Sequence, residues 1–346
     1  MHQSSTPYFG LPLEVFLNVL DQLVGFPDGR QPIFDASSSI TKTLRALTLT
    51  SRAIYLVASR YLYSRCLYLG DCVGYACLRR TLGLDLGNHP QSLPYGQAGR
   101  NDRLWHDAKI DRYITSISIS PMRPGHDVST PMVRLPQILD LCNTIGATLK
   151  RLVLDMQPVY YSHSEVEHTR PYWDEPNMFL QMPNLEDLVA SYDVLDYFPL
   201  PPPNLKRLAL TIQDLHDTVM RFCFSISSLQ KLVLLRPVEL SAADIDSLFA
   251  AYKGHSLDVV LVDVNPNHRT PKDTRDWTEA DTVRVWEVDV PTSFYGDDDD
   301  LVLCDGWVWR HAVQGTLWTR ECRRMASWSE VRRRLVGPVH HIVDAV

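Results

Sequence analysis

The sequence lacks the features that mark membrane-spanning, secreted and nucleic-acid-binding proteins. Its longest apolar runs fall well short of the roughly 20 residues that a membrane span needs. Its first residues contain no basic segment followed by an apolar one, so no secretory signal is visible. The formal net charge of −7 argues against a general nucleic-acid-binding surface, which has to be basic. We therefore expect no membrane and no nucleic acid among its partners, and a cytoplasmic or nuclear location.

Disulfide and metal signatures are also missing. Seven cysteines is an odd number and no Cys-x-x-Cys occurs, which is typical of reduced, buried thiols. His163 and His168 flank Glu165 and Glu167, but this spacing places them on no shared helical face. The acidic run 297–300 lacks the alternating acids of a calcium-binding loop, and we expect a solvated hairpin turn there. The sequence predicts no metal and no cofactor.

Catalytic motifs are absent as well. The chain contains no Gly-x-x-x-x-Gly-Lys-Ser/Thr, no Gly-x-Gly-x-x-Gly, no His-Glu-x-x-His and no Gly-x-Ser-x-Gly. We therefore predict that it is not an enzyme, with an unrecognised site in the α/β region as the alternative.

The most informative feature that is present is an apolar helix at residues 11–23. Pro12 suits a first helical position, and Glu14 suits the first turn of a helix. The polar residues share one narrow sector, whereas the apolar residues cover an arc of roughly 200° at 100° per residue. A helix that packs on one core needs an apolar stripe of about 100°. This helix is therefore either fully buried or in contact with two surfaces, one of them on another chain.

Two further segments give this helix a context. Residues 44–52 read Leu-x-x-Leu-x-Leu-Thr-Ser-Arg, and residues 58–63 read Ala-x-x-x-Leu-Tyr. With Leu-Pro-x-Glu-Val at 11–15, the segment 11–69 resembles the F-box in the form common in fungal proteins. The gap at 26–42 is longer than the usual spacing in that family. An ordinary three-helix subdomain is the alternative.

The resemblance implies that a Skp-type adaptor and the cullin of a ubiquitin ligase are partners. Some of the implied adaptor contacts must also form the core of the module, and the sequence does not sort them. The implied adaptor contacts are Leu11, Pro12, Val15, Phe16, Val19, Leu20, Leu44, Leu47 and Leu49.

From residue 113 onward, short runs of the form Leu-x-x-Leu-x-Leu recur at intervals of about 20 to 36 residues. Such runs suit short strands, and this spacing is typical of repeat proteins. Helix-like stripes at 135–145, 215–223 and 241–252 lie between some of them. This alternation resembles a degenerate leucine-rich-repeat solenoid, with a plain α/β domain as the alternative. The strand-like runs are 114–119, 149–154, 185–189, 205–210, 229–234 and 257–262.

We predict a mixed α/β fold in four segments. They are an F-box-like helical module at 1–69, a connecting segment at 70–112, a leucine-rich-repeat-like domain at 113–269 and a C-terminal cap at 270–346. Within the cap, alternation at 282–290 predicts a half-buried strand, and residues 327–330 form a capping box. The basic run 332–334 is either a nuclear localisation signal or the solvated side of the last helix, and we favour the second.

In a solenoid, the outward-pointing strand residues face solvent and are available to a partner. Here they form a rather basic stripe, which is either a docking surface for an acidic or phosphorylated protein or simply a solvated face. The basic residues of this stripe are Lys150, Arg151, Lys206, Arg207 and Lys231.

The F-box resemblance, together with the repeat-like region, implies the substrate-recognition subunit of a cullin–RING ubiquitin ligase, which would hold an unknown target near the conjugating enzyme and form or break no bond itself. The alternative is a repeat scaffold that belongs to no ligase.

Overall fold

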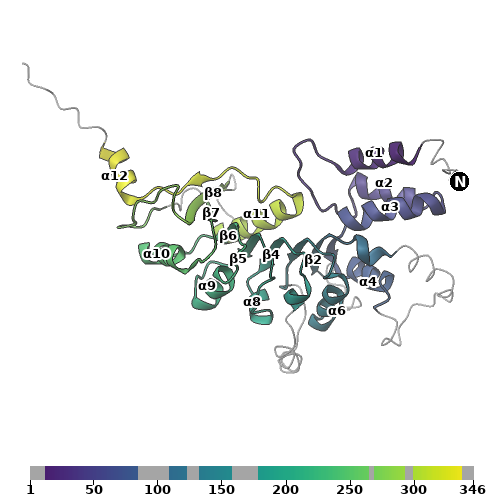
Figure 1. The fold of residues 1–346 in the computed structure, drawn as a ribbon, viewed down its shortest axis with the longest axis horizontal. Coiled ribbons are helices and arrows are strands. Elements are labelled where there is room, and N and C mark those ends of the chain that lie inside the picture. Colours follow the sequence, from purple (N-terminus) through teal and green to yellow (C-terminus); the bar gives the residue numbers. More distant parts are fainter. Residues whose placement is uncertain are drawn as a thin grey trace, which may run out of the picture. The chain divides into compact units, whose positions relative to one another are not determined.

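The computed structural model describes residues 12–84, 109–122, 132–157, 178–264, 269–292 and 299–336 (Figure 1). The chain divides into two compact units, and each is described by itself. Unit 1 comprises Met1–Leu205 and Trp309–Thr319, and unit 2 comprises Lys206–Val308 and Arg320–Val346. This division falls inside the predicted repeat region, and the predicted limits at 69, 112 and 269 stay predictions. The mixed α/β class is confirmed.

Unit 1 begins with three helices, as predicted. They are α1 (Leu13–Val24), α2 (Ser39–Thr48) and α3 (Arg52–Arg65). The Ser38 and Ser51 hydroxyls accept hydrogen bonds from backbone N–H groups in the first turns of α2 and α3, which fixes where these helices begin. The helices share one core, which consists of Phe16, Leu20, Val24, Leu44, Ile54, Val57 and Ala58.

The polar gap between α1 and α2 is anchored by its own apolar residues. Ile33 is buried, and its N–H donates to the Val313 carbonyl at 2.8 Å. The Phe34 N–H donates to the Arg65 carbonyl at 2.8 Å. Gly315 lies at φ +70°, and a Cβ there would come within 2.8 Å of the Gln31 backbone, so only glycine fits this approach.

The strands of unit 1 are parallel and follow one another in chain order. They are β1 (Tyr68–Asp71), β2 (Ser116–Met122), β3 (Arg151–Leu154) and β4 (Asp187–Ser191). Ile117, Leu152 and Leu188 are register partners, and all three are fully buried. Figure 1 shows helices along one side of these strands. The remaining helical elements of unit 1 are α4 (Cys72–Thr81), the 3-10 turns η1 (Ile110–Tyr113) and η3 (Met178–Gln181), α6 (Leu135–Ile145) and α8 (Val194–Tyr197).

The turns that lead into these strands repeat one hydrogen-bonding arrangement. The Asn184 side chain donates to the Ala147 carbonyl at 2.7 Å, and the Asn204 side chain donates to the Pro183 carbonyl at 2.8 Å. Thr148 occupies the corresponding position and donates to the Ile114 carbonyl at 2.9 Å. Each of these polar residues precedes a fully buried leucine. Successive turns of unit 1 are therefore joined by side chains as well as by the strand ladder.

Unit 2 continues with the same alternation of strands and helices. Its parallel strands are β5 (Arg207–Thr211), β6 (Lys231–Leu235), β7 (Leu257–Val264) and β8 (Val283–Val290), and β9 (Arg323–Arg324) pairs antiparallel with β8. Its helices include α9 (Asp217–Phe224), α10 (Ala242–Ala251) and α12 (Trp328–Val336), while α11 (Asp300–Gln314) has residues in each unit. The strand predicted at 282–290 is confirmed at Val283–Val290, and so is the capping box of α10, in which Ser241 and Asp244 bond reciprocally.

Two expectations are corrected. Outward-pointing strand residues such as Val153, Val189 and Val233 are buried, so the strands are covered on both faces. The reason lies in the sequence, because both the odd and the even positions of these strands are apolar, as in parallel strands buried on two sides. In the described part of the acidic run, the Asp299 carboxylate accepts the Leu301 N–H at 2.8 Å and α11 begins there, in place of a hairpin turn.

Candidate partner-binding surfaces

Helix α1 divides its apolar residues between the core and the surface. Phe16 and Leu20 point into the core and are 4% and 1% exposed, whereas Val15 and Val19 are 42% and 52% exposed. Pro12 is the exposed N-cap residue, and it lies at the i, i+3, i+7 spacing with the two valines. These three residues form an exposed apolar stripe on α1, which we call the α1 stripe.

The orientation of α1 is fixed by a hydrogen bond from α3. The Tyr61 hydroxyl donates to the Asp21 carboxylate at 2.7 Å. Burial, together with this hydrogen bond, raises the pKa of Tyr61 to about 12, so the hydroxyl stays protonated and able to donate at neutral pH. The core contacts and this bond hold α1 so that its stripe faces away from α2 and α3.

The other residues with an implied adaptor contact lie in different environments. Leu44 belongs to the same core as Phe16 and Leu20, so these three side chains are buried and are not exposed for contact with a partner. Leu47 is half-buried against the same core, and Leu49, the C-cap residue of α2, is 87% exposed. Leu11 lies outside the described residues.

The predicted basic stripe is not one continuous surface. In unit 1, Arg151 is buried beside its register partner Asp187, while Lys150 is exposed in the turn before β3. In unit 2, Lys206 is exposed, and Arg207 and Lys231 are half-buried register partners. The same row continues with Asp258, which pairs with Arg284 at 2.7 Å. Charges of both signs therefore occur along this row.

Polar side chains gather where the strands of unit 1 end. The Ser120 hydroxyl donates to Asp155 at 3.0 Å, and the Ser191 hydroxyl donates to Asp193 at 2.6 Å. Burial raises the pKa of Asp155, although hydrogen bonds from Gln157 and Ser120 act in the opposite direction. The carboxyl edge of a parallel sheet is where α/β proteins often bind ligands. Here these groups satisfy one another, so the cluster serves to fix the strand ends.

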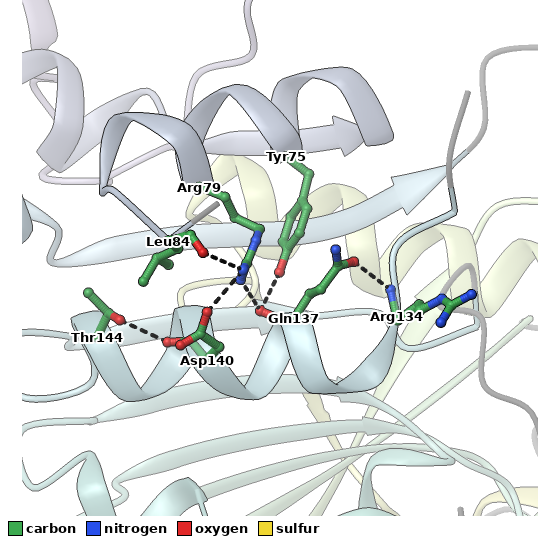
Figure 2. Close-up of polar contacts among 7 residues, drawn as sticks. All are labelled: Tyr75, Arg79, Leu84, Arg134, Gln137, Asp140 and Thr144. Carbon is green, nitrogen blue, oxygen red and sulfur yellow. Dashed lines mark hydrogen bonds and ion pairs between the residues drawn. The ribbon is translucent and has the colours of Figure 1, made fainter. Parts of the chain in front are cut away.

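A buried arginine joins α4 to α6 (Figure 2). The Arg79 guanidinium donates to the Gln137 carbonyl at 2.7 Å and to Asp140 at 2.9 Å, and it also reaches the Leu84 carbonyl. The Tyr75 hydroxyl donates to the same Gln137 carbonyl at 2.7 Å. Sequence periodicity did not identify this network, because its partners are about 60 positions apart.

A second buried arginine organises the ends of the unit 2 strands. Arg236 lies 2.6 Å from Glu287 and 3.7 Å from Asp263, and Arg323 of β9 lies 3.2 Å from the second oxygen of Glu287. Arg236 and Glu287 are both buried. This chain of ion pairs connects β6, β7, β8 and β9.

Unit 2 also contains a pocket of about 590 Å³ beside α12. Sequence reasoning interpreted the arginines here as a solvated helix face and did not identify a pocket. The only sequence signal for the pocket was that Ser329, Arg332, Arg333 and Val336 lie at i, i+3, i+4 and i+7, which places polar and apolar residues on the same face of the helix. The residues that line the pocket are Asp273, Thr274, Trp328, Ser329, Arg332, Arg333 and Val336.

Within the described ranges, no group of three or more His, Cys, Asp or Glu side chains is arranged to hold a metal ion. The residues His163, Glu165, Glu167 and His168 lie outside those ranges. In the same part of the chain, no helix has both the length and the apolar composition needed to cross a bilayer.

Comparison with known proteins gives no further assignment. No protein-family model matches the chain, and no significantly similar curated protein is found.

Proposed function

We propose that this chain is a substrate receptor of a cullin–RING ubiquitin ligase, which binds a Skp-type adaptor through α1–α3 and a target protein through the rest of the chain. The observation that carries the proposal is the α1 stripe. Val15 and Val19 stay exposed, although α1 already buries Phe16 and Leu20 in its own core. Exposed apolar side chains that lie next to each other on one helix offer an apolar surface to another protein. The order of the segments at 11–69, which resembles the F-box, supports a Skp-type adaptor as the partner.

The proposed target-binding region is a degenerate leucine-rich-repeat-like solenoid. Three features of unit 1 support this. Its strands are parallel and in chain order, its turns each place a buried leucine ahead of the strand, and Asn184 and Asn204 each bond to the preceding turn. A repeat architecture needs contacts of this nearest-neighbour kind.

Binding of a purified fungal Skp-type adaptor to the full chain tests the proposal. Complete burial of a valine contributes about 1.5 kcal/mol, so two half-exposed valines together contribute roughly 1.5 kcal/mol. Since 1.4 kcal/mol corresponds to a factor of ten, Val15→Ser with Val19→Ser is expected to weaken adaptor binding at least about tenfold. Thermal unfolding of this variant should be almost unchanged, because neither side chain lies in the core.

A matched control is Val73→Ser on α4. Val73 is 53% exposed, close to the exposure of Val19, but it lies outside the three-helix module. It should leave adaptor binding intact. If the folded wild-type chain does not bind the adaptor, or if the control weakens binding as much as the double variant does, the ligase assignment is wrong and a scaffold role is favoured.

A further inference from the structure

The pocket beside α12 is built on one face of a short helix. Ser329, Arg332, Arg333 and Val336 line it, and their i, i+3, i+4, i+7 spacing is that of a single helical contact face. Trp328 borders the same face. No residue of α12 is buried, so this face is not used for packing within the described part of the chain.

The charges of α12 are distributed unevenly. Arg334 is paired with Glu330 one turn earlier, whereas the described residues offer no carboxylate in an ion pair with Arg332 or Arg333. The Arg332 guanidinium lies 6.0 Å from the centre of the Trp328 ring. Asp273 is the one acid that lines the pocket, and Asp276 nearby interacts electrostatically with Arg333 and Arg324. Three arginines, Arg324, Arg332 and Arg333, therefore meet two carboxylates here, which leaves one positive charge in excess next to an indole ring and an exposed valine.

The Asp276 carboxylate also anchors the start of α12. Asp276 accepts hydrogen bonds from the hydroxyls of Ser327 and Ser329, the second at 2.7 Å. These bonds hold the start of α12 against the 269–292 segment. The pocket wall formed by α12 is thus anchored at its N-terminal end, and the arginines project from the anchored helix.

We propose that this pocket binds a short acidic segment of a partner protein. Carboxylates of the segment pair with Arg332 and Arg333, which are suited to bidentate contacts, and an apolar side chain between them packs on Trp328 and Val336. The volume of about 590 Å³ is in the usual range for small ligand sites, so a few residues of the segment fill it. If the chain is a substrate receptor, this is a site for its target, and that part of the inference rests on the proposed function.

The test uses the full chain without adaptor and a fluorescein-labelled hexapeptide of alternating Glu and Leu, with binding measured by fluorescence anisotropy. The same peptide with Gln in place of Glu is the ligand control. We expect the Glu peptide to bind, the Gln peptide to bind at least tenfold more weakly, and the affinity for the Glu peptide to fall as salt is raised.

Variants connect this binding to the pocket. Arg332→Gln with Arg333→Gln should lower the affinity at least tenfold, while Arg334→Gln, which removes an arginine paired on the far face, should change it less than twofold. Equal binding of both peptides, or equal effects of the two arginine variants, would overturn the proposal. Binding to vesicles of anionic lipid but not to the Glu peptide would replace it with a membrane ligand.

The two proposals can fail independently. The variant Val15→Ser with Val19→Ser should still bind the Glu peptide with unchanged affinity, because those residues lie in unit 1 and the pocket lies in unit 2. If a variant loses adaptor binding but still binds the peptide, the result concerns the α1 stripe alone. If a variant loses peptide binding but still binds the adaptor, the result concerns the pocket alone.

Discussion

Removal of the Arg236 side chain is expected to destabilise unit 2 strongly. Its guanidinium lies 2.6 Å from Glu287 and 3.7 Å from Asp263, and it also donates to the Arg269 carbonyl. In Arg236→Met, Glu287 keeps only Arg323, which is about half-exposed, and both acids stay desolvated. Breaking a buried ion pair by removing one partner costs about 3–5 kcal/mol. We expect a loss in this range.

The measurement has to report on unit 2 by itself, because a chain with two compact units does not unfold in one step of defined free energy. Hydrogen exchange of the β6, β7 and β8 amides gives the local opening free energy. The control is Arg334→Met, which breaks an exposed pair and should cost at most about 1 kcal/mol. Adding Glu287→Met to Arg236→Met should cost less than the sum of the two single changes, by about 0.5–3 kcal/mol. A loss in Arg236→Met as small as in the control would refute the reasoning.

Three further predictions follow from the structure. Gly315→Ala should lower the melting temperature by several degrees, because a positive φ costs a non-glycine residue about 1–3 kcal/mol; Gly306→Ala, in an open helical position, should not destabilise the chain. Leu20→Ala should cost about 2–5 kcal/mol and Val19→Ala less than about 0.5 kcal/mol in the local opening free energy of the α1–α3 amides measured by hydrogen exchange, and similar losses would show that α1 is placed wrongly. Hydrogen bonds from two serine hydroxyls lower the pKa of Asp276, so its stabilisation of α12 is complete above the unfolded pKa of about 3.9 and is lost as the pH falls through the lower folded pKa. The protection factors of the α12 amides, which are the exchange rates of an unfolded peptide divided by their own at the same pH, should fall on acidification below about pH 4, and Asp276→Asn should remove that dependence.

Local sequence signals predicted most of the elements that frame the candidate surfaces. The Leu-x-x-Leu-x-Leu runs became parallel strands, because their apolar positions alternate at the period of a strand. The capping boxes at Ser241 and Ser327 both form hydrogen bonds at the start of a helix. These features depend on residues within a few positions of one another, which is why the sequence reveals them.

The features that the sequence did not predict depend on contacts between residues that are far apart in the chain. Helix α11 is rich in apolar residues with no clear stripe, so its periodicity gave no signal. The buried networks of Arg79 and Arg236 join residues about 30 to 60 positions apart, and arginine is otherwise expected at the surface. The pocket beside α12 forms only where that helix meets the 269–292 segment.

The amino-acid sequence alone predicted a helix at residues 11–23 with a wide apolar arc, because helical periodicity is a local property, and the helix is found at Leu13–Val24. Only the tertiary structure decided that Phe16 and Leu20 lie in the core while Val15 and Val19 lie on the surface. The reason is that burial depends on how α2 and α3 pack against α1, and many side chains from separate parts of the chain determine that packing together.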